Sequence, residues 1–161
     1  MRTAYKIMRI AYKVLAYLVA AEVAVQAMVM AWFISGLIKW VLNGGIVDMS
    51  IEIEGSFPEI VGILVHGING FIVIPALALL LLIVSFFTKV PGAIKWAAIV
   101  LVLVAVQVLL GTFGHHFTLS GALHGLNALA LFAAALYAGR RLRAATAAAV
   151  EQPEARTAAP V

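Results

Sequence analysis

Residues 93–113 read AIKWAAIVLVLVAVQVLLGTF, and this stretch decides the fold class. Its one charged residue is Lys95, and a helix needs about 20 apolar residues to cross the hydrocarbon core of a bilayer. Three more stretches have the same character, roughly residues 11–38, 59–87 and 118–138. The sequence therefore predicts an all-α integral membrane protein, with four transmembrane helices in one domain over residues 1–143 and a disordered cytoplasmic tail over residues 144–161.

The composition excludes several other classes of protein. Hydrophobic residues make up 65% of the 161 residues and charged residues 11%, whereas a soluble domain is about 45–50% apolar and about 25% charged. A chain without cysteine forms no disulfide, iron–sulfur cluster or thiolate-ligated metal site. The net charge of +4 comes from basic residues that flank the apolar stretches, so we expect the lipid bilayer, and no nucleic acid, as a partner.

The short links predict how the helices are connected and oriented. Links near residues 88–92 and 114–117 place successive helices as antiparallel neighbours, which predicts a compact up-down bundle. Ten of the eleven Lys and Arg residues fall on one side of the predicted membrane, and Lys39 alone lies on the other side with four acidic residues. Under the positive-inside rule both termini are cytoplasmic (N-in/C-in), in a multi-pass protein of the cytoplasmic membrane. The acidic residues are Asp48, Glu52, Glu54 and Glu59.

A His-Gly-x-Asn motif occurs twice. His66-Gly67-Ile68-Asn69 lies in the second predicted helix and His124-Gly125-Leu126-Asn127 in the fourth. Both helices run from the outside to the inside, and each histidine follows the outer end of its helix by seven or eight residues. At about 1.5 Å per residue both imidazoles lie about 10–12 Å below the outer surface. We therefore expect the two rings to face each other across the core.

Small and polar side chains accompany the two histidines. Gly62 and Gly70 flank His66 by one turn on each side, and Gly121 precedes His124 by nearly one turn. Such residues leave a flat slot in which a planar macrocycle fits against the backbone. Asn69 and Asn127, three residues after each histidine, could orient a ligand or bond between helices. The alternative is that the same residues only mediate helix packing, as Gly121-x-x-x-Gly125 would do by itself.

The other two helices carry a weaker repeat. Ala24-Val25-Gln26 in the first resembles Ala105-Val106-Gln107 in the third. The chain then consists of two pseudo-repeated helix pairs, each with a Gln-bearing helix followed by a His-bearing one. Gln26 and Gln107 either support the histidines or hydrogen-bond between helices. Glu22 lies in mid-span, where an ionised carboxylate is costly, and its role is open.

The second half of the chain resembles heme A synthases. The resemblance rests on Val106-Gln107-Val108-Leu109-Leu110-Gly111, on His115-His116 and on Leu123-His124-Gly125. Those enzymes contain two fused four-helix halves, each able to hold heme between histidines of its second and fourth helices. The resemblance covers about residues 10–140 and implies that His66 and His124 are axial ligands. The chain is also similar to small uncharacterised four-helix membrane proteins of bacteria that have a Leu-His-x-x-Asn helix.

This chain departs from heme A synthases in three respects. It contains one half only, it lacks the loop cysteines of many members, and no local motif aligns the acidic residues of its first link with the family's catalytic carboxylate. The oxidase chemistry is therefore less well supported by the resemblance than the heme ligands are.

Two imidazoles on one iron leave no vacant position, which suits electron transfer. We therefore expect a membrane b-type cytochrome with one bis-histidine heme b near the outer leaflet, for electron transfer or heme handling. His115 and His116 either reach the heme propionates or are exposed loop residues. We also expect a homo-oligomer and a membrane or extracytoplasmic redox partner. Two alternatives remain: a compact heme A synthase-like oxidoreductase that acts as a homo-oligomer, and a heme-free structural or accessory membrane subunit.

Overall fold

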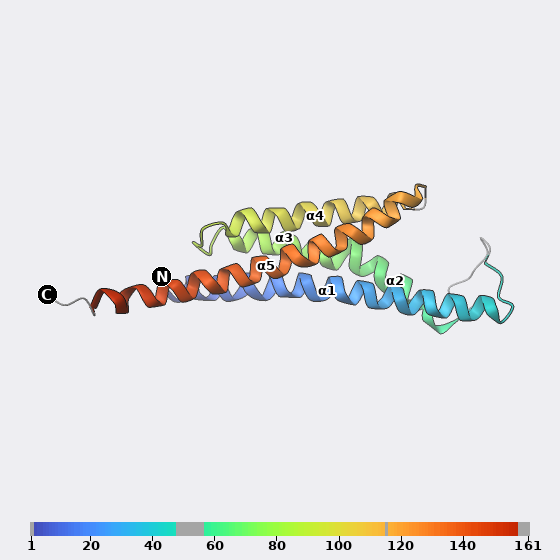
Figure 1. Cartoon of the computed structure of the whole chain (residues 1–161), viewed down its shortest axis with the longest axis horizontal. Helices are drawn as coiled ribbons and strands as arrows, with labels where there is room; N and C mark the ends of the chain where they lie inside the picture. The colour runs from blue at the N-terminus through green and yellow to red at the C-terminus, as the bar shows by residue number, and fades with distance from the viewer. Residues whose placement is uncertain (1, 48–56, 115, 158–161) are drawn as a thin grey trace.

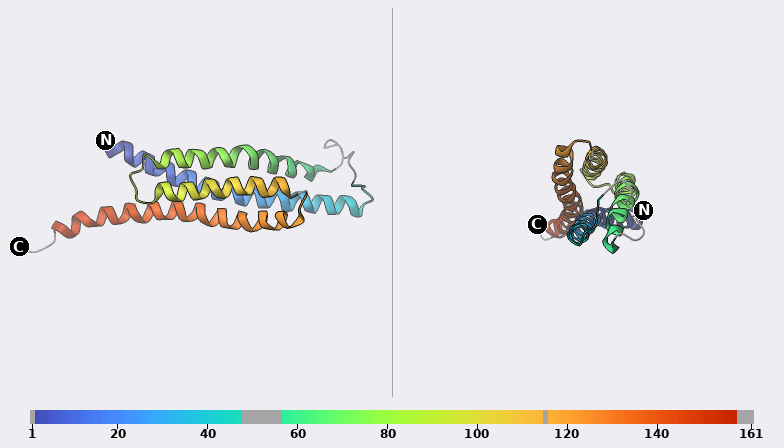
Figure 2. Two further views of the ribbon diagram at one scale, coloured as in Figure 1. Left: turned by 90° about the horizontal axis from the view of Figure 1, so that it is seen from above. Right: turned by 90° about the vertical axis from the view of Figure 1, so that its right-hand side faces the viewer.

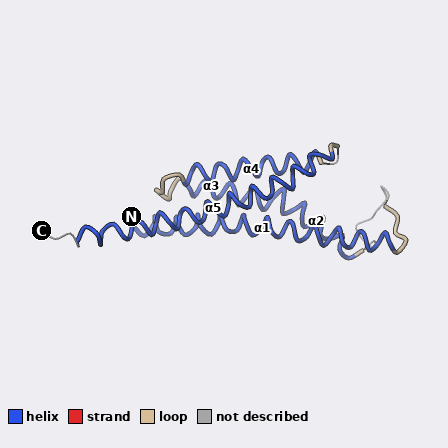
Figure 3. The backbone as a smooth tube through the Cα atoms, viewed as in Figure 1, coloured by secondary structure: helices blue, strands red, loops and turns tan. Residues whose placement is uncertain are grey.

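The computed structural model describes residues 2–47, 57–114 and 116–157, and all regular structure within these ranges is helical (Figure 3). Four of its helical stretches are long and apolar enough to span a membrane, which confirms the prediction of an all-α protein with four such helices. The second of these is not one regular helix but four consecutive segments. The elements are α1 (Arg2–Leu42), η1 (Pro58–Ile60), α2 (Val61–Ile68), η2 (Asn69–Val73), α3 (Ile74–Ser85), α4 (Ala93–Phe113) and α5 (Thr118–Thr157).

The helices pack around a common axis (Figure 2). α1 packs against α3 and α5, and α4 packs against the same two helices from the other side. The start of α1, the α3–α4 connection and the end of α5 lie at one end of the molecule, which we call the basic end (Figures 1 and 2). The end of α1, the start of α2 and the α4–α5 connection lie at the opposite end, called the far end.

The tightly packed core occupies the half of the bundle nearer the basic end. Its centre consists of alanines from all four spans that have no exposed surface: Ala16, Ala78, Ala97 and Ala135. Small side chains let helix backbones approach closely, which is how helices associate in lipid. Leu81, Val100 and Leu131 fill the space between them. The core therefore fixes the relative positions of the four helices in this half.

The helices separate toward the far end. There α2 packs on α1 while α4 packs on α5, and the two pairs diverge in Figure 1. Side chains between the pairs at this level, such as His66 and His124, are only half-buried. The bundle is thus more tightly packed in the half nearer the basic end than in the far half.

The irregular stretch of the second span has a local cause. Pro75 has no backbone N–H, and its ring clashes with the carbonyl four residues earlier, that of Phe71. The chain widens into the π-helix η2, in which the N–H of Ile74 bonds to the carbonyl oxygen of Asn69. Proline and such π turns are common causes of helix irregularity. The predicted continuous helix over residues 59–87 is therefore interrupted in its middle.

The end of the chain also differs from the prediction. Where the sequence predicted a disordered tail from residue 144, α5 continues as a helix to Thr157. Alanine has the highest helix propensity, and this stretch is rich in it. Four predicted functional residues, Asp48, Glu52, Glu54 and His115, lie outside the described residues.

Candidate functional site

The two repeated histidines meet between the diverging helix pairs. The ring centroids of His66 on α2 and His124 on α5 are 6.0 Å apart, with an angle of 56° between the ring planes. The proximity that the repeated motif predicted is thus present. Because α2 and α5 belong to different pairs, the two rings approach each other from different helix pairs.

The ring of His124 is held by α4. Its Nδ1 lies 3.0 Å from the carbonyl oxygen of Gln107. A carbonyl only accepts, so this contact requires a proton on Nδ1 and leaves the Nε2 lone pair free. Gly111, one turn after Gln107, makes room for the ring: a Cβ atom there would lie 3.0 Å from Cε1 of His124. Gly111 was not among the predicted site residues, although its spacing from Gln107 places both on one helix face.

His66 is supported differently. Gln26 donates a hydrogen bond from Nε2 to the backbone oxygen of His66 at 3.3 Å. Two side-chain atoms here are buried and have no hydrogen-bond partner among the described residues, Nδ1 of His66 and Oε1 of Gln26. A buried polar atom without a partner costs about 1–3 kcal/mol. These two atoms are complementary, since a protonated Nδ1 donates and an amide oxygen accepts.

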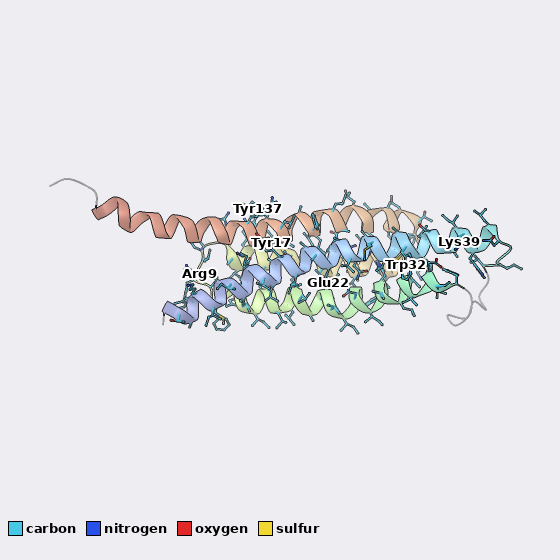
Figure 4. The ribbon with its side chains drawn as sticks, turned by 90° about the horizontal axis from the view of Figure 1, so that it is seen from below. Arg9, Tyr17, Glu22, Trp32, Lys39 and Tyr137 are labelled. Atoms are coloured by element: carbon cyan, nitrogen blue, oxygen red, sulfur yellow. The ribbon has the colours of Figure 1, made fainter. Side chains whose placement is uncertain are left out.

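The two asparagines tie each His-bearing segment to its neighbour. Asn127 donates from Nδ2 to Oε1 of Gln107 at 2.6 Å and to the carbonyl oxygen of Leu103 at 2.9 Å. Asn69 donates from Nδ2 to Oε2 of Glu22 at 2.6 Å. Figure 4 shows Glu22 between Arg9 and Lys39 along α1, far from either end of the helix. The two halves of the repeat therefore use Gln–Asn and Glu–Asn contacts at related positions.

The predicted glycines divide into two groups. Gly62 faces α1, where a Cβ atom would lie 2.6 Å from the carbonyl oxygen of Val29, and Gly70 faces Gln26 on the same helix. Both therefore serve the packing of the second span on α1 and do not line a slot beside His66. Gly121 and Gly125, by contrast, have no atom within 4 Å of the position of an added Cβ. The same is true of Gly67.

The remaining predicted residues add no further ligand beside the two imidazoles. His116 is exposed at the α4–α5 connection. Within the part of the chain that the structure describes, no group of three or more His, Asp or Glu side chains could hold a metal ion. The site therefore offers two facing imidazoles and no third protein ligand from these residues.

No family model, no curated protein and no solved structure matches the chain.

Proposed function

We propose that this protein is a membrane b-type cytochrome in which His66 and His124 bind one heme b as its two axial ligands. The observation that carries the proposal is the 6.0 Å between the ring centroids. A metal–imidazole bond is about 2.0–2.1 Å long, so two imidazoles on opposite sides of one metal ion have ring centroids about 6 Å apart.

The donor set fits a heme better than an isolated ion. A protein metal site usually has three or more side-chain ligands, whereas a macrocycle supplies four nitrogens and needs only the axial positions filled. The Nδ1 contact of His124 with a backbone carbonyl is also the usual outer partner of a metal-bound histidine. It fixes the ring and leaves Nε2 as the nitrogen that can bind a metal.

The surroundings of the two imidazoles leave them accessible to a ligand. Both histidines are only half-buried, and Gly121 and Gly125 on the His124 helix are exposed. Heme, when bound, supplies reversible one-electron transfer. The chain's own residues bind it, orient the two rings and shield it from water, and these contacts set the potential.

The proposal includes an up-down bundle with both termini in the cytoplasm and the heme near the outer leaflet of the cytoplasmic membrane. The support is the distribution of charge, because the basic end carries nearly all Lys and Arg residues. A membrane or extracytoplasmic redox partner and a homo-oligomer complete the proposal.

A second candidate is a heme-free structural or accessory membrane subunit. One observation favours it: Asn127–Gln107 and Asn69–Glu22 are hydrogen bonds between neighbouring helices, which would hold a bundle together without any ligand. The heme A synthase-like enzyme rests on acidic residues of the first link that, apart from Glu59, lie outside the described residues.

Heme binding by single-histidine variants tests these candidates. The purified protein is expected to bind one heme with the absorption spectrum of a six-coordinate b-type center. His66→Ala and His124→Ala should each lose the heme or convert it to a five-coordinate form. His116→Ala, which removes an imidazole from the exposed connection, should keep the six-coordinate spectrum. Full, spectrally unchanged heme in both site variants would contradict the ligand assignment, and a wild-type protein that binds no heme would favour the structural subunit.

A further inference from the structure

The basic end contains a second candidate site, which the proposed cytochrome function does not use. A small, shallow surface pocket lies where the α3–α4 connection and the start of α4 meet α1 and α5. Its lining combines apolar atoms with one guanidinium group. The lining residues are Tyr12, Val90, Pro91, Gly92, Ala93, Trp96, Ala138 and Arg141.

The guanidinium of Arg141 is exposed and has two neighbours. It lies against Gly92, whose φ of 80° and lack of a side chain allow the approach: a Cβ atom there would lie 3.2 Å from Nε and 3.3 Å from Nη2. Nη1 donates to the hydroxyl oxygen of Tyr137 at 3.3 Å. The ring of Tyr137 in turn packs on Trp96, with centroids 4.3 Å apart. Arginine has five N–H donors, so this contact leaves several for a ligand.

The charge around the pocket is entirely positive over a long stretch of sequence. Residues 1–21 and 84–143 contain no Asp or Glu. The next acidic residues on α5 begin at Glu151, ten positions after Arg141 and so about 15 Å further along the helix. The basic residues of this end include Lys6, Arg9, Lys13, Lys89, Lys95, Arg140 and Arg141. Arg141 is exposed, and no acidic side chain in these stretches competes for its guanidinium, so the group is accessible to an anion from outside the protein.

The position of the pocket along the bundle identifies the kind of anion. The candidate membrane spans end at Ser85, begin again at Ala93 and end at Arg141, so the pocket lies where the apolar stretches stop. Trp and Tyr side chains are enriched at this depth of a membrane, beside the lipid headgroups. Phe86, Phe87 and Ile94 are exposed nearby and offer apolar surface to acyl chains.

We infer that this pocket binds the phosphate of an anionic phospholipid. Arg141 pairs with the phosphate oxygens, Trp96 lines the pocket beside it, and the surrounding basic residues attract the headgroup. Planar guanidinium groups match phosphate geometry, and basic pockets between membrane helices bind anionic headgroups.

Lipid binding to the full-length protein in neutral detergent tests this inference. Retention of phosphatidylglycerol is measured by native mass spectrometry, with phosphatidylcholine and inorganic phosphate as the other probes. The wild type is expected to retain phosphatidylglycerol selectively. Arg141→Gln should weaken that binding about tenfold or more, because charge-assisted hydrogen bonds contribute about 1.5–3 kcal/mol. Arg140→Gln, the matched control, removes the same charge one residue away from a side chain that does not line the pocket, and should weaken binding less than about threefold.

Three outcomes would overturn the inference. Equal losses in Arg140→Gln and Arg141→Gln would mean that the lipid responds only to net charge. Binding of inorganic phosphate as strongly as the lipid would mean a free-anion site. Equal retention of phosphatidylcholine would exclude recognition of the anionic headgroup. Arg141→Lys keeps the charge without the planar fork and should give an intermediate loss. None of these measurements involves heme, so they test this pocket independently of the proposed cytochrome function.

Discussion

At the scale of single residues, the two histidines obtain their orientation from different kinds of acceptor. His124 uses the backbone oxygen of Gln107, which no substitution removes. His66 lies beside Gln26. The side-chain oxygen of Gln26 and the Nδ1 atom of His66 are both buried, and neither has a hydrogen-bond partner among the described residues. A heme that fixes the ring of His66 would bring the two atoms into register as donor and acceptor. Gln26 would then be a positioning residue for the ligand on its side.

Matched substitutions of the two glutamines test this asymmetry. Gln26→Met is expected to raise the midpoint potential of the heme by about 50 mV, because an acceptor on Nδ1 strengthens the imidazole as a ligand and favours the oxidised iron. The size follows from a hydrogen bond of about 1 kcal/mol and from 59 mV per tenfold change for one electron. Gln107→Met removes a side chain but not the carbonyl that orients His124, so it should shift the potential much less. A redox titration of both variants is the measurement, and equal shifts would show that Gln26 has no specific role.

At the scale of secondary-structure elements, the π-helix η2 sets the rotation of α2 relative to α3. One residue of an α-helix corresponds to a rotation of about 100°, so a turn with an extra residue changes which face of the preceding segment meets its neighbours. In this structure α2 presents Gly62 to α1 and His66 to α5, while α3 presents Ala78 and Leu81 to the core. The bulge thus lets one span satisfy two packing requirements.

Removal of Pro75 tests this dependence. Pro75→Ala restores an N–H that can bond to the carbonyl of Phe71, so η2 is expected to relax toward a regular α-helix and turn His66 away from His124. Heme should dissociate about tenfold or more faster, while the helix content measured by circular dichroism stays the same. Pro91→Ala, in the α3–α4 connection far from the histidines, is the control. Unchanged heme dissociation in Pro75→Ala would mean that the Asn69–Glu22 bond, and not the proline, maintains the bulge.

The elements also show what the sequence could and could not predict. Helix positions were predictable because a membrane span is defined by length and hydrophobicity, and the similar depth of His66 and His124 followed from counting residues. The rotation of each helix about its own axis could not be predicted, because helices that are apolar on all faces have no amphipathic pattern to orient them. This is why Gly62 and Gly70 proved to face α1, and why Gly111 was not assigned to the site. The π turn depends on a clash between Pro75 and a backbone carbonyl that hydropathy does not report.

At the scale of the whole molecule, the bundle has two halves with different packing. The half near the basic end has an alanine-rich core with side chains that are completely buried, and Tyr12 and Arg9 tie α1 to the start of α4 and to the α3–α4 connection through backbone carbonyls. In the far half the helix pairs diverge. A scaffold of this kind places the two imidazoles, 6.0 Å apart, in the less tightly packed half of the molecule.

Hydrogen exchange should therefore respond to heme in one half only. Local opening requires little free energy where few side chains are buried, and a ligand that bridges the two pairs raises that free energy. We expect heme to slow amide exchange in α2 and in α5 up to Leu131, and to change it little in α3 and in the first half of α4, which the core already protects. The double variant of His66 and His124 to Ala should show no such slowing when heme is added. Equal slowing of amide exchange along all four spans would indicate that the ligand stabilises the bundle as a unit. The far half would then not open independently of the rest of the fold.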